Sequence, residues 1–204
     1  MRRFTTILCS FSLLVVQARA TDPAAPAPPV TATVQREPVN TTVPIFRAYL
    51  NAGPDKFSFL IPENFRMGGE TAPGTLKLTS LTGDTLITLS FLDPAFKEAT
   101  EIKADACRES LAGRYPAGKF GAEFSRPVLG RKAVCYDVEW KSPAGQAQIT
   151  RTIYVPTVAG VIELTATAGT KKFRDAENNF NEILASFTAA KDGKLVIHRI
   201  AEMN

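Results

Sequence analysis

Histidine is almost absent from this sequence, and so are the residue spacings that mark common catalytic sites. His198 is the only histidine in 204 residues, so a Ser-His-Asp or Cys-His arrangement would have to recruit it from the C-terminal tail. No cysteine or histidine spacing typical of a metal site occurs, and Gly68-Gly69 and Gly113 do not stand in the context of a phosphate-binding loop or a dinucleotide fingerprint. The sequence therefore predicts no cofactor and no metal, and it favours a protein that is not an enzyme.

Concentrated positive charge is missing as well. The 24 lysines and arginines exceed the 20 aspartates and glutamates by four, but three of the arginines lie within residues 1–20, which contain no acid. Without that segment the counts are 21 and 20, a net charge of +1. A nucleic-acid-binding domain usually carries a basic stripe. None occurs here, so the sequence predicts no nucleic-acid partner.

The sequence also lacks a hydrophobic run long enough to span a bilayer. The N-terminal apolar stretch, residues 4–16, falls well short of the roughly 20 residues that a transmembrane helix needs. It follows two arginines, and Ala18 and Ala20 then place small residues at positions −3 and −1 of a signal-peptidase site. We expect residues 1–20 to be a signal peptide cleaved between Ala20 and Thr21. The protein is then periplasmic or secreted and has no permanent transmembrane span.

The composition divides the rest of the chain into three parts. Residues 21–45 are rich in proline, alanine and threonine, which predicts a disordered spacer. Residues 46–190 have the length and composition of one folded domain. Residues 191–204 form a tail that could be an extra edge strand, a docked segment or an arm that becomes ordered on binding.

Two cysteines remain once Cys9 leaves with the signal peptide. Export to an oxidising compartment favours a disulfide between Cys107 and Cys135. In the strand around Cys135, however, alternate residues form the apolar face, and Cys135 points the other way. The bridge is possible only if the helix that carries Cys107 covers that second face, and the alternative is two buried free thiols.

Hydrophobic periodicity predicts an antiparallel sheet with two helices. A stripe at Ala104, Cys107, Leu111 and Tyr115 predicts a helix over 101–115, and Gly68-Gly69 predicts a turn. The clearest amphipathic pattern lies near the C-terminus, at Phe173, Ala176, Phe180, Ile183, Leu184 and Phe187. Predicted strands occupy residues 57–61, 75–81, 86–92, 119–129, 132–141, 146–155 and 158–167. Strands joined by tight turns and accompanied by helices indicate an α+β sandwich.

Three local strings resemble the PsbP-like family, which includes the extrinsic photosystem II protein PsbP and DcrB-type bacterial envelope proteins. They are the opening strand and turn over 57–65, the strand that ends Leu89-Ser90-Phe91 before a helix, and the helix over 179–187 with its I-L-x-S-F finish. The resemblance implies an antiparallel sheet with helices on both faces, an α/β/α sandwich, which would also permit the disulfide. It implies a binding or assembly accessory protein rather than an enzyme, and it transfers no functional residues.

A few polar and aromatic residues remain as candidates for a site. Asp137 and Glu139 share one face of a strand and could act as acid and base or hold a cation, but a solvated face is the simpler interpretation. Tyr136, Trp140 and Tyr154 could line a pocket, although their alternation along strands is also that of core residues.

The leading hypothesis from the sequence is an exported, non-catalytic accessory protein of the cell envelope or the exterior. Its partner would be another envelope protein or a small ligand. One alternative is a hydrolase that uses the carboxylates of Asp137 and Glu139. The other is a purely structural or stress-related envelope component.

Overall fold

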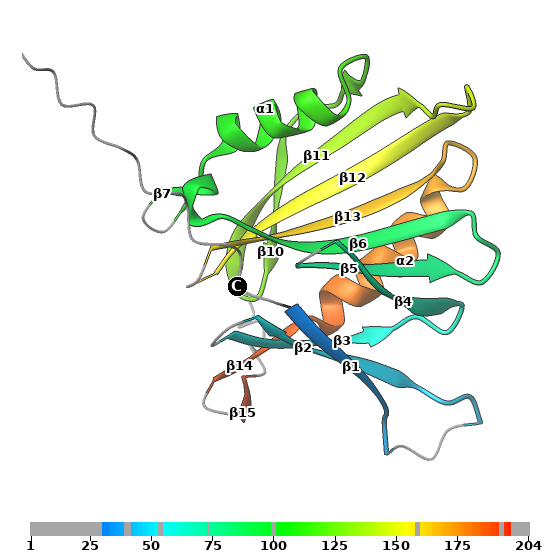
Figure 1. The fold of residues 1–204 in the computed structure, drawn as a ribbon, viewed down its shortest axis with the longest axis vertical. Helices are drawn as coiled ribbons and strands as arrows, with labels where there is room; N and C mark the ends of the chain where they lie inside the picture. Colours follow the sequence, from blue (N-terminus) through cyan, green and yellow to red (C-terminus); the bar gives the residue numbers. More distant parts are fainter. Residues whose placement is uncertain are drawn as a thin grey trace, which may run out of the picture.

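The computed structural model describes residues 30–38, 42–52, 55–72, 74–98, 101–157, 160–191 and 194–196. In this part of the chain, strands dominate and two α-helices accompany them (Figure 1). The predicted signal peptide, its cleavage site at Ala20 and Thr21, and His198 lie outside the described residues. None of the described helices is long and apolar enough to cross a membrane.

The larger sheet is antiparallel throughout and runs in the order β10-β11-β12-β13-β6-β5-β4, with the short β9 paired to β11. Its long central strands form because β-branched and aromatic residues alternate with polar ones. A two-residue turn, Leu129-Gly130, joins β10 to β11, and both residues have the positive φ that such tight hairpins require. The strands are β4 (Phe65–Ala72), β5 (Thr75–Ser80), β6 (Thr85–Leu92), β9 (Lys119–Phe120), β10 (Phe124–Val128), β11 (Arg131–Lys141), β12 (Ala147–Pro156) and β13 (Val161–Gly169).

The two helices lie on opposite faces of this sheet. Helix α1 (Ala104–Arg114) follows a crossing segment made of the 3-10 turn η1 (Pro94–Phe96) and the short pair β7 (Lys97–Glu98) and β8 (Glu101–Ile102). Helix α2 (Phe173–Ser186) follows β13 and buries the predicted apolar stripe. Because neighbouring residues of a strand point to opposite faces, Tyr136 packs in the cluster with α1 while Cys135 packs in the cluster with α2.

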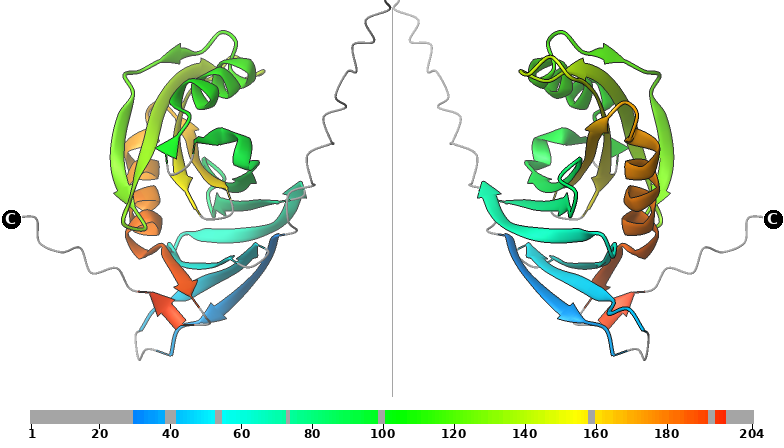
Figure 2. Two further views of the ribbon diagram at one scale, coloured as in Figure 1. Left: turned by 90° about the vertical axis from the view of Figure 1, so that its left-hand side faces the viewer. Right: turned by 90° about the vertical axis from the view of Figure 1, so that its right-hand side faces the viewer.

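A second sheet of five strands was not foreseen. It runs in the order β1-β2-β3-β14-β15 and packs its inner side against the C-terminal end of α2, where Phe57 and Phe59 lie 5.8 and 5.9 Å from Phe187 between ring centroids. Figure 2 shows it below the larger sheet. Its strands are β1 (Val30–Arg36), β2 (Phe46–Ala52), β3 (Asp55–Ile61), β14 (Thr188–Lys191) and β15 (Lys194–Val196).

Two segment assignments from the sequence need correction, and one open alternative is decided. Residues 30–36, placed in the spacer, form β1, because alternating Val and Thr favour a strand even beside a proline-rich segment. Gly68 and Gly69 lie inside β4, where the register shifts between Gly68 and Ala72, so these glycines mark a bulge and not a turn. In the tail, residues 194–196 form an edge strand, one of the three alternatives that the sequence left open.

The α+β class is confirmed, but the description as one sheet between helices is too simple. Strands outnumber helices strongly among the described residues, and five of those strands form the separate second sheet.

The predicted disulfide is not formed. Cys107 and Cys135 are free, fully buried thiols in two different clusters on opposite faces of the larger sheet. The condition set by the sequence, that the helix carrying Cys107 cover the face of Cys135, is not met because α1 covers the other face. The alternative of two buried thiols is the one observed.

Candidate functional site

The face covered by α1 contains an unusual number of buried polar groups. Tyr136 from β11 and Tyr154 from β12 are almost completely buried beneath Cys107 and Leu111 of α1. Their rings meet edge to face, with centroids 6.4 Å apart. These tyrosines are core residues, as the simpler interpretation of the sequence held, but each carries a hydroxyl that needs a partner inside the protein.

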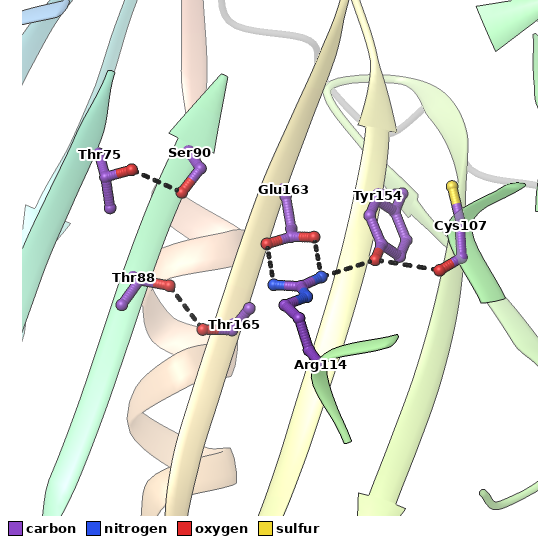
Figure 3. Close-up of polar contacts among 8 residues, drawn as sticks. All are labelled: Thr75, Thr88, Ser90, Cys107, Arg114, Tyr154, Glu163 and Thr165. Atoms are coloured by element: carbon purple, nitrogen blue, oxygen red, sulfur yellow. Dashed lines mark hydrogen bonds and ion pairs between the residues drawn. The ribbon is translucent and has the colours of Figure 1, made fainter. Parts of the chain in front are cut away.

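An ion pair between the half-exposed Arg114 and the buried Glu163 supplies one of these partners. Arg114, the last residue of α1, donates from Nη1 to Glu163 Oε1 at 2.8 Å and bonds the second carboxylate oxygen through Nη2 (Figure 3). Nη2 also lies 3.1 Å from the hydroxyl of Tyr154, which in turn lies 3.5 Å from the carbonyl oxygen of Cys107. Glu163 and Tyr154 stand opposite each other on β13 and β12. The cluster therefore fixes the end of α1 to the two central strands.

The surroundings shift the pKa values of these groups in directions that follow from burial and charge. Burial opposes the charge of Arg114, but the hydrogen bond and negative charge of Glu163 outweigh it, so the pKa of Arg114 is raised. Burial raises the pKa of Tyr154, and the charge of Glu163 raises it further. Burial raises the pKa of the Cys107 thiol to about 12, which leaves it un-ionised and unreactive at neutral pH.

Tyr136 is held in a similar way at the start of α1. Its hydroxyl lies 2.7 Å from Glu123 Oε2 and 3.0 Å from the carbonyl oxygen of Ala104. Burial and the hydrogen bond to Glu123 raise the pKa of Tyr136. Both ends of α1 are thus tied to tyrosines of the sheet.

Beyond α1 the same face stays polar across β13, β6 and β5. Thr88 and Thr165 share a hydrogen bond of 2.6 Å, and Thr75 and Ser90 one of 3.1 Å (Figure 3). The hydroxyl of Thr152 differs from these, because its buried Oγ1 has no hydrogen-bond partner among the described residues.

A groove opens where α1 ends and the β11–β12 hairpin projects. Its volume is about 580 Å³, within the range of small-molecule sites. Tyr115 and Trp140 contribute aromatic surface, with ring centroids 5.1 Å apart. Trp140 is fixed because its Nε1 donates to Thr150 Oγ1 at 2.9 Å. The groove is lined by Arg114, Tyr115, Pro116, Ala117, Gly118, Lys119, Glu139, Trp140, Lys141, Pro143, Ala147, Gln148 and Thr170. We call it the Trp140 groove.

The loop after α1 is held close to β11 by a glycine. A Cβ at Gly118 would lie 2.6 Å from Val138 Cγ1 and 3.0 Å from the carbonyl oxygen of Tyr115. Only glycine permits this approach, so the sequence Pro116-Ala117-Gly118 sets the wall of the Trp140 groove against the sheet.

Charge in the Trp140 groove is predominantly positive. The residues that line it include three basic ones, Arg114, Lys119 and Lys141, and one acid, Glu139. Arg114 is already bound to Glu163, but neither lysine has a salt bridge within the part of the chain that the structure describes. The residues around the groove therefore combine an aromatic surface with a small excess of positive charge.

Of the two predicted carboxylates, Glu139 is among the residues that line the Trp140 groove, whereas Asp137 belongs to the face that α2 covers. Asp137 accepts two hydrogen bonds from Arg151, at 2.8 and 2.7 Å, and Arg151 also binds Glu177 of α2. Its guanidinium lies over the rings of Phe124 and Phe173. Asp137 thus belongs to a partly buried charge network that holds α2, with Arg151 as its countercharge, and not to a solvated face.

Sequence reasoning brought Trp140 and Tyr154 forward but missed the ion pair that links their surroundings. Glu163 is the lone charged residue of the strand Val161–Gly169. An isolated acid in an otherwise uncharged strand requires a buried partner, and that signal could have indicated it. The partner Arg114 carries no comparable signal, because arginine at the end of a helix is ordinary.

Comparison with known proteins finds similarity in structure only. No protein-family model and no curated protein matches the chain. Solved structures that it resembles include LpqN of Mycobacterium tuberculosis, a protein involved in cell envelope biogenesis (11% identity, 79% of this chain and 92% of that chain, TM-score 0.44). They also include a cyanobacterial PsbP from Synechocystis (13% identity, 77% of this chain and 92% of that chain, TM-score 0.43). A third is the Ran-binding protein Mog1p of Saccharomyces cerevisiae (12% identity, 64% of this chain and 88% of that chain, TM-score 0.45).

A PsbP, from the family that the local strings resemble, is among these structures. At such identities the similarity concerns the fold alone, and no ligand or partner of those proteins is transferred to this chain.

Proposed function

We propose that this protein is an exported, non-catalytic accessory protein that binds a ligand in the Trp140 groove. The signal peptide predicted for residues 1–20 supports export to the periplasm or the exterior. The observation that carries the binding function is the groove itself, with fixed aromatic walls and an excess of positive charge. Such an arrangement of apolar lining and a few polar groups is typical of ligand sites.

The lining indicates the chemical class of the ligand. Tyr115 and Trp140 offer flat surfaces to an apolar or aromatic body, whereas Lys119 and Lys141 at the same groove favour an anionic group. A ligand with both features, such as an aromatic or aliphatic carboxylate or sulfonate, satisfies the whole site. A purely apolar ligand would leave the cations unused, and a small inorganic anion would leave the aromatic surface exposed.

A non-catalytic role is supported by the way in which the reactive groups are held. The thiols of Cys107 and Cys135 are buried with pKa values raised to about 12. Asp137 is neutralised by the bidentate contact with Arg151. Glu163 is buried and bound to Arg114. Each of these groups stabilises the fold.

The proposal is tested with 1-anilinonaphthalene-8-sulfonate, which combines an aromatic body with one negative charge. Trp140 is the only tryptophan, so energy transfer from tryptophan to the bound probe reports occupancy of this groove directly. Two unit charges about 4 Å apart near a protein surface interact by roughly 1–4 kcal/mol. Lys141→Glu should therefore weaken binding about tenfold or more.

Lys132→Glu is the matched control, because Lys132 is an exposed residue at the opposite end of β11. It changes the net charge of the protein equally and should leave the affinity unchanged. Binding without energy transfer, or equal effects of the two variants, would contradict a ligand site at Trp140.

A further inference from the structure

The sheets end in strands whose outer backbone groups are open to pairing, and these edges are protected to different degrees. Edge strands usually carry proline, a bulge or a lysine that prevents another chain from adding to the sheet. Strand β10 contains Pro127, and β4 contains the bulge between Gly68 and Ala72. Strand β15 is only three residues long. Three of the four edge strands of the two main sheets, β10, β4 and β15, are thus protected against pairing with another chain.

Strand β1 has none of these protections. It is a regular strand of seven residues, Val30–Arg36, paired with β2 without a register shift. It contains no proline, glycine or lysine. Figure 2 shows it as the outermost strand of the second sheet. Its free side is long and regular enough to accept another strand.

Exposed apolar side chains gather beside this edge. Four large hydrophobic residues of the described chain are strongly exposed, and three of them lie on or just before β1 and β2: Val34 at 41%, Val43 at 42% and Phe46 at 41%. Val34 stands opposite Ala48, two residues along from the Arg36–Phe46 pair, so Val34 and Phe46 lie on one face of the sheet. Apolar surface next to an open edge is typical of an interaction surface.

We propose that β1 pairs antiparallel with β1 of a second copy of this chain, about a two-fold axis at Thr33. Full overlap of the seven residues places Thr33 opposite Thr33 of the second copy and Val34 opposite its Ala32. Arg36, the only charged residue of the strand, then stands opposite Val30 of the second copy, so no like charges meet. A two-fold contact uses both open edges at once and closes the assembly.

The expected dimer is weak and reversible. A pair of seven-residue strands with a few apolar side chains buries less than the roughly 800 Å² per partner of a standard stable interface. This contact does not involve the Trp140 groove, which lies on the larger sheet. The inference is therefore independent of the function proposed for that groove.

Sedimentation velocity of the full chain over a range of concentrations tests this inference. The sedimentation coefficient of the native sequence should rise with concentration, as for a monomer–dimer equilibrium. Thr33 is exposed, so Thr33→Lys and Thr33→Glu should keep the fold, checked by circular dichroism. Each variant alone places two like charges opposite each other at the axis and should remain monomeric.

An equimolar mixture of the two variants should restore the dimer, because lysine then faces glutamate. Ser125→Lys, on the already protected strand β10, is the control and should dimerise like the native protein. A native chain that stays monomeric would overturn the inference. So would dimerisation of Thr33→Lys alone, or a mixture that stays monomeric.

Discussion

The two faces of the larger sheet are built from the same strands but by different means. The face beneath α2 is a large apolar cluster that joins both sheets through aromatic side chains. Helix α2 buries Phe180, Ile183 and Leu184 in it, and Phe173 and Ala176 in a smaller cluster beside it. The face beneath α1 is a small cluster in which α1 buries only Cys107 and Leu111. Hydroxyl groups and the Arg114–Glu163 pair make up much of the rest of that face.

This difference suggests that one face of the sheet provides most of the stability and the other positions the proposed binding site. An extensive apolar face contributes most of the favourable free energy of folding, because the burial of apolar surface is the largest driving force for folding. A polar face contributes less and fixes positions through hydrogen bonds that each need a partner. The α2 face therefore holds the fold together, whereas the α1 face positions the Trp140 groove. Three changes probe this division, and a failure of any of them would alter it.

The largest effect is expected on the α2 face, for Phe180→Ala. Phe180 is completely buried in the large cluster, and truncation of such a side chain costs about 3–5 kcal/mol. Urea denaturation followed by circular dichroism measures this loss in the free energy of unfolding. Arg174→Ala, at an exposed position of the same helix, should change it by no more than about 0.5 kcal/mol. A loss below about 1 kcal/mol for Phe180→Ala would mean that the α2 face does not dominate stability.

A smaller effect is expected on the α1 face, for Glu163→Ala. The change removes the carboxylate that holds the guanidinium of Arg114, which in turn bonds the hydroxyl of Tyr154. The side chain of Arg114 is 40% exposed, so water compensates in part, and we expect a cost of about 1–3 kcal/mol. The double variant Arg114→Ala/Glu163→Ala should recover part of it, because no unpaired charge remains. If the losses of Arg114→Ala and Glu163→Ala, measured singly, add up to the loss of the double variant, the two residues do not act as a pair.

The third expected effect involves both faces and is a loss of stability in alkali. A cysteine in the unfolded chain ionises near pH 9.0, whereas burial raises the pKa of Cys107 and Cys135 to about 12 in the folded protein. Above pH 9 the unfolded chain releases protons that the folded chain keeps, so the free energy of unfolding falls as pH rises. The slope is about 1.4 kcal/mol per pH unit for each such thiol, and the raised pKa values of Tyr136 and Tyr154 act with the same sign.

Thermal and urea unfolding at about pH 8, 9, 10 and 11 measure this dependence. Stability should be level up to about pH 9 and decline beyond it. Cys107→Ala removes one ionising group, so the free energy of unfolding should fall less steeply with pH, by about 1.4 kcal/mol per pH unit. An identical slope in this variant would mean that Cys107 is accessible and ionises alike in both states.

The sequence predicted those parts of the fold whose pattern is periodic and local. The stripe from Phe173 to Phe187 identified α2, and alternation identified most of the larger sheet. Strand β1 was missed because its Val and Thr residues stand beside a proline-rich segment, whose average composition hides them. The sheet to which it belongs depends on pairing between β3 and β14, which are far apart in the sequence, and no local pattern reports such a contact.

The site was predicted only in part for the same reason. Trp140 and Tyr154 could be identified as candidates by residue type, but whether an aromatic side chain lies in a groove or a core depends on the elements above it. The disulfide prediction failed on this point, because residue spacing does not reveal which face of the sheet α1 covers. The Arg114–Glu163 pair joins a helix end to a strand 49 residues later, a distance at which sequence alone gives no register.

The central claim, that the Trp140 groove binds a small anionic ligand with an apolar body, is tested most directly by native mass spectrometry of the exported protein from its own host. We predict a mature chain that begins at Thr21 and carries a small acidic adduct, and Trp140→Ala should lose this adduct while it keeps the fold. A chain that carries no adduct, or an adduct retained equally by Trp140→Ala, would contradict the claim.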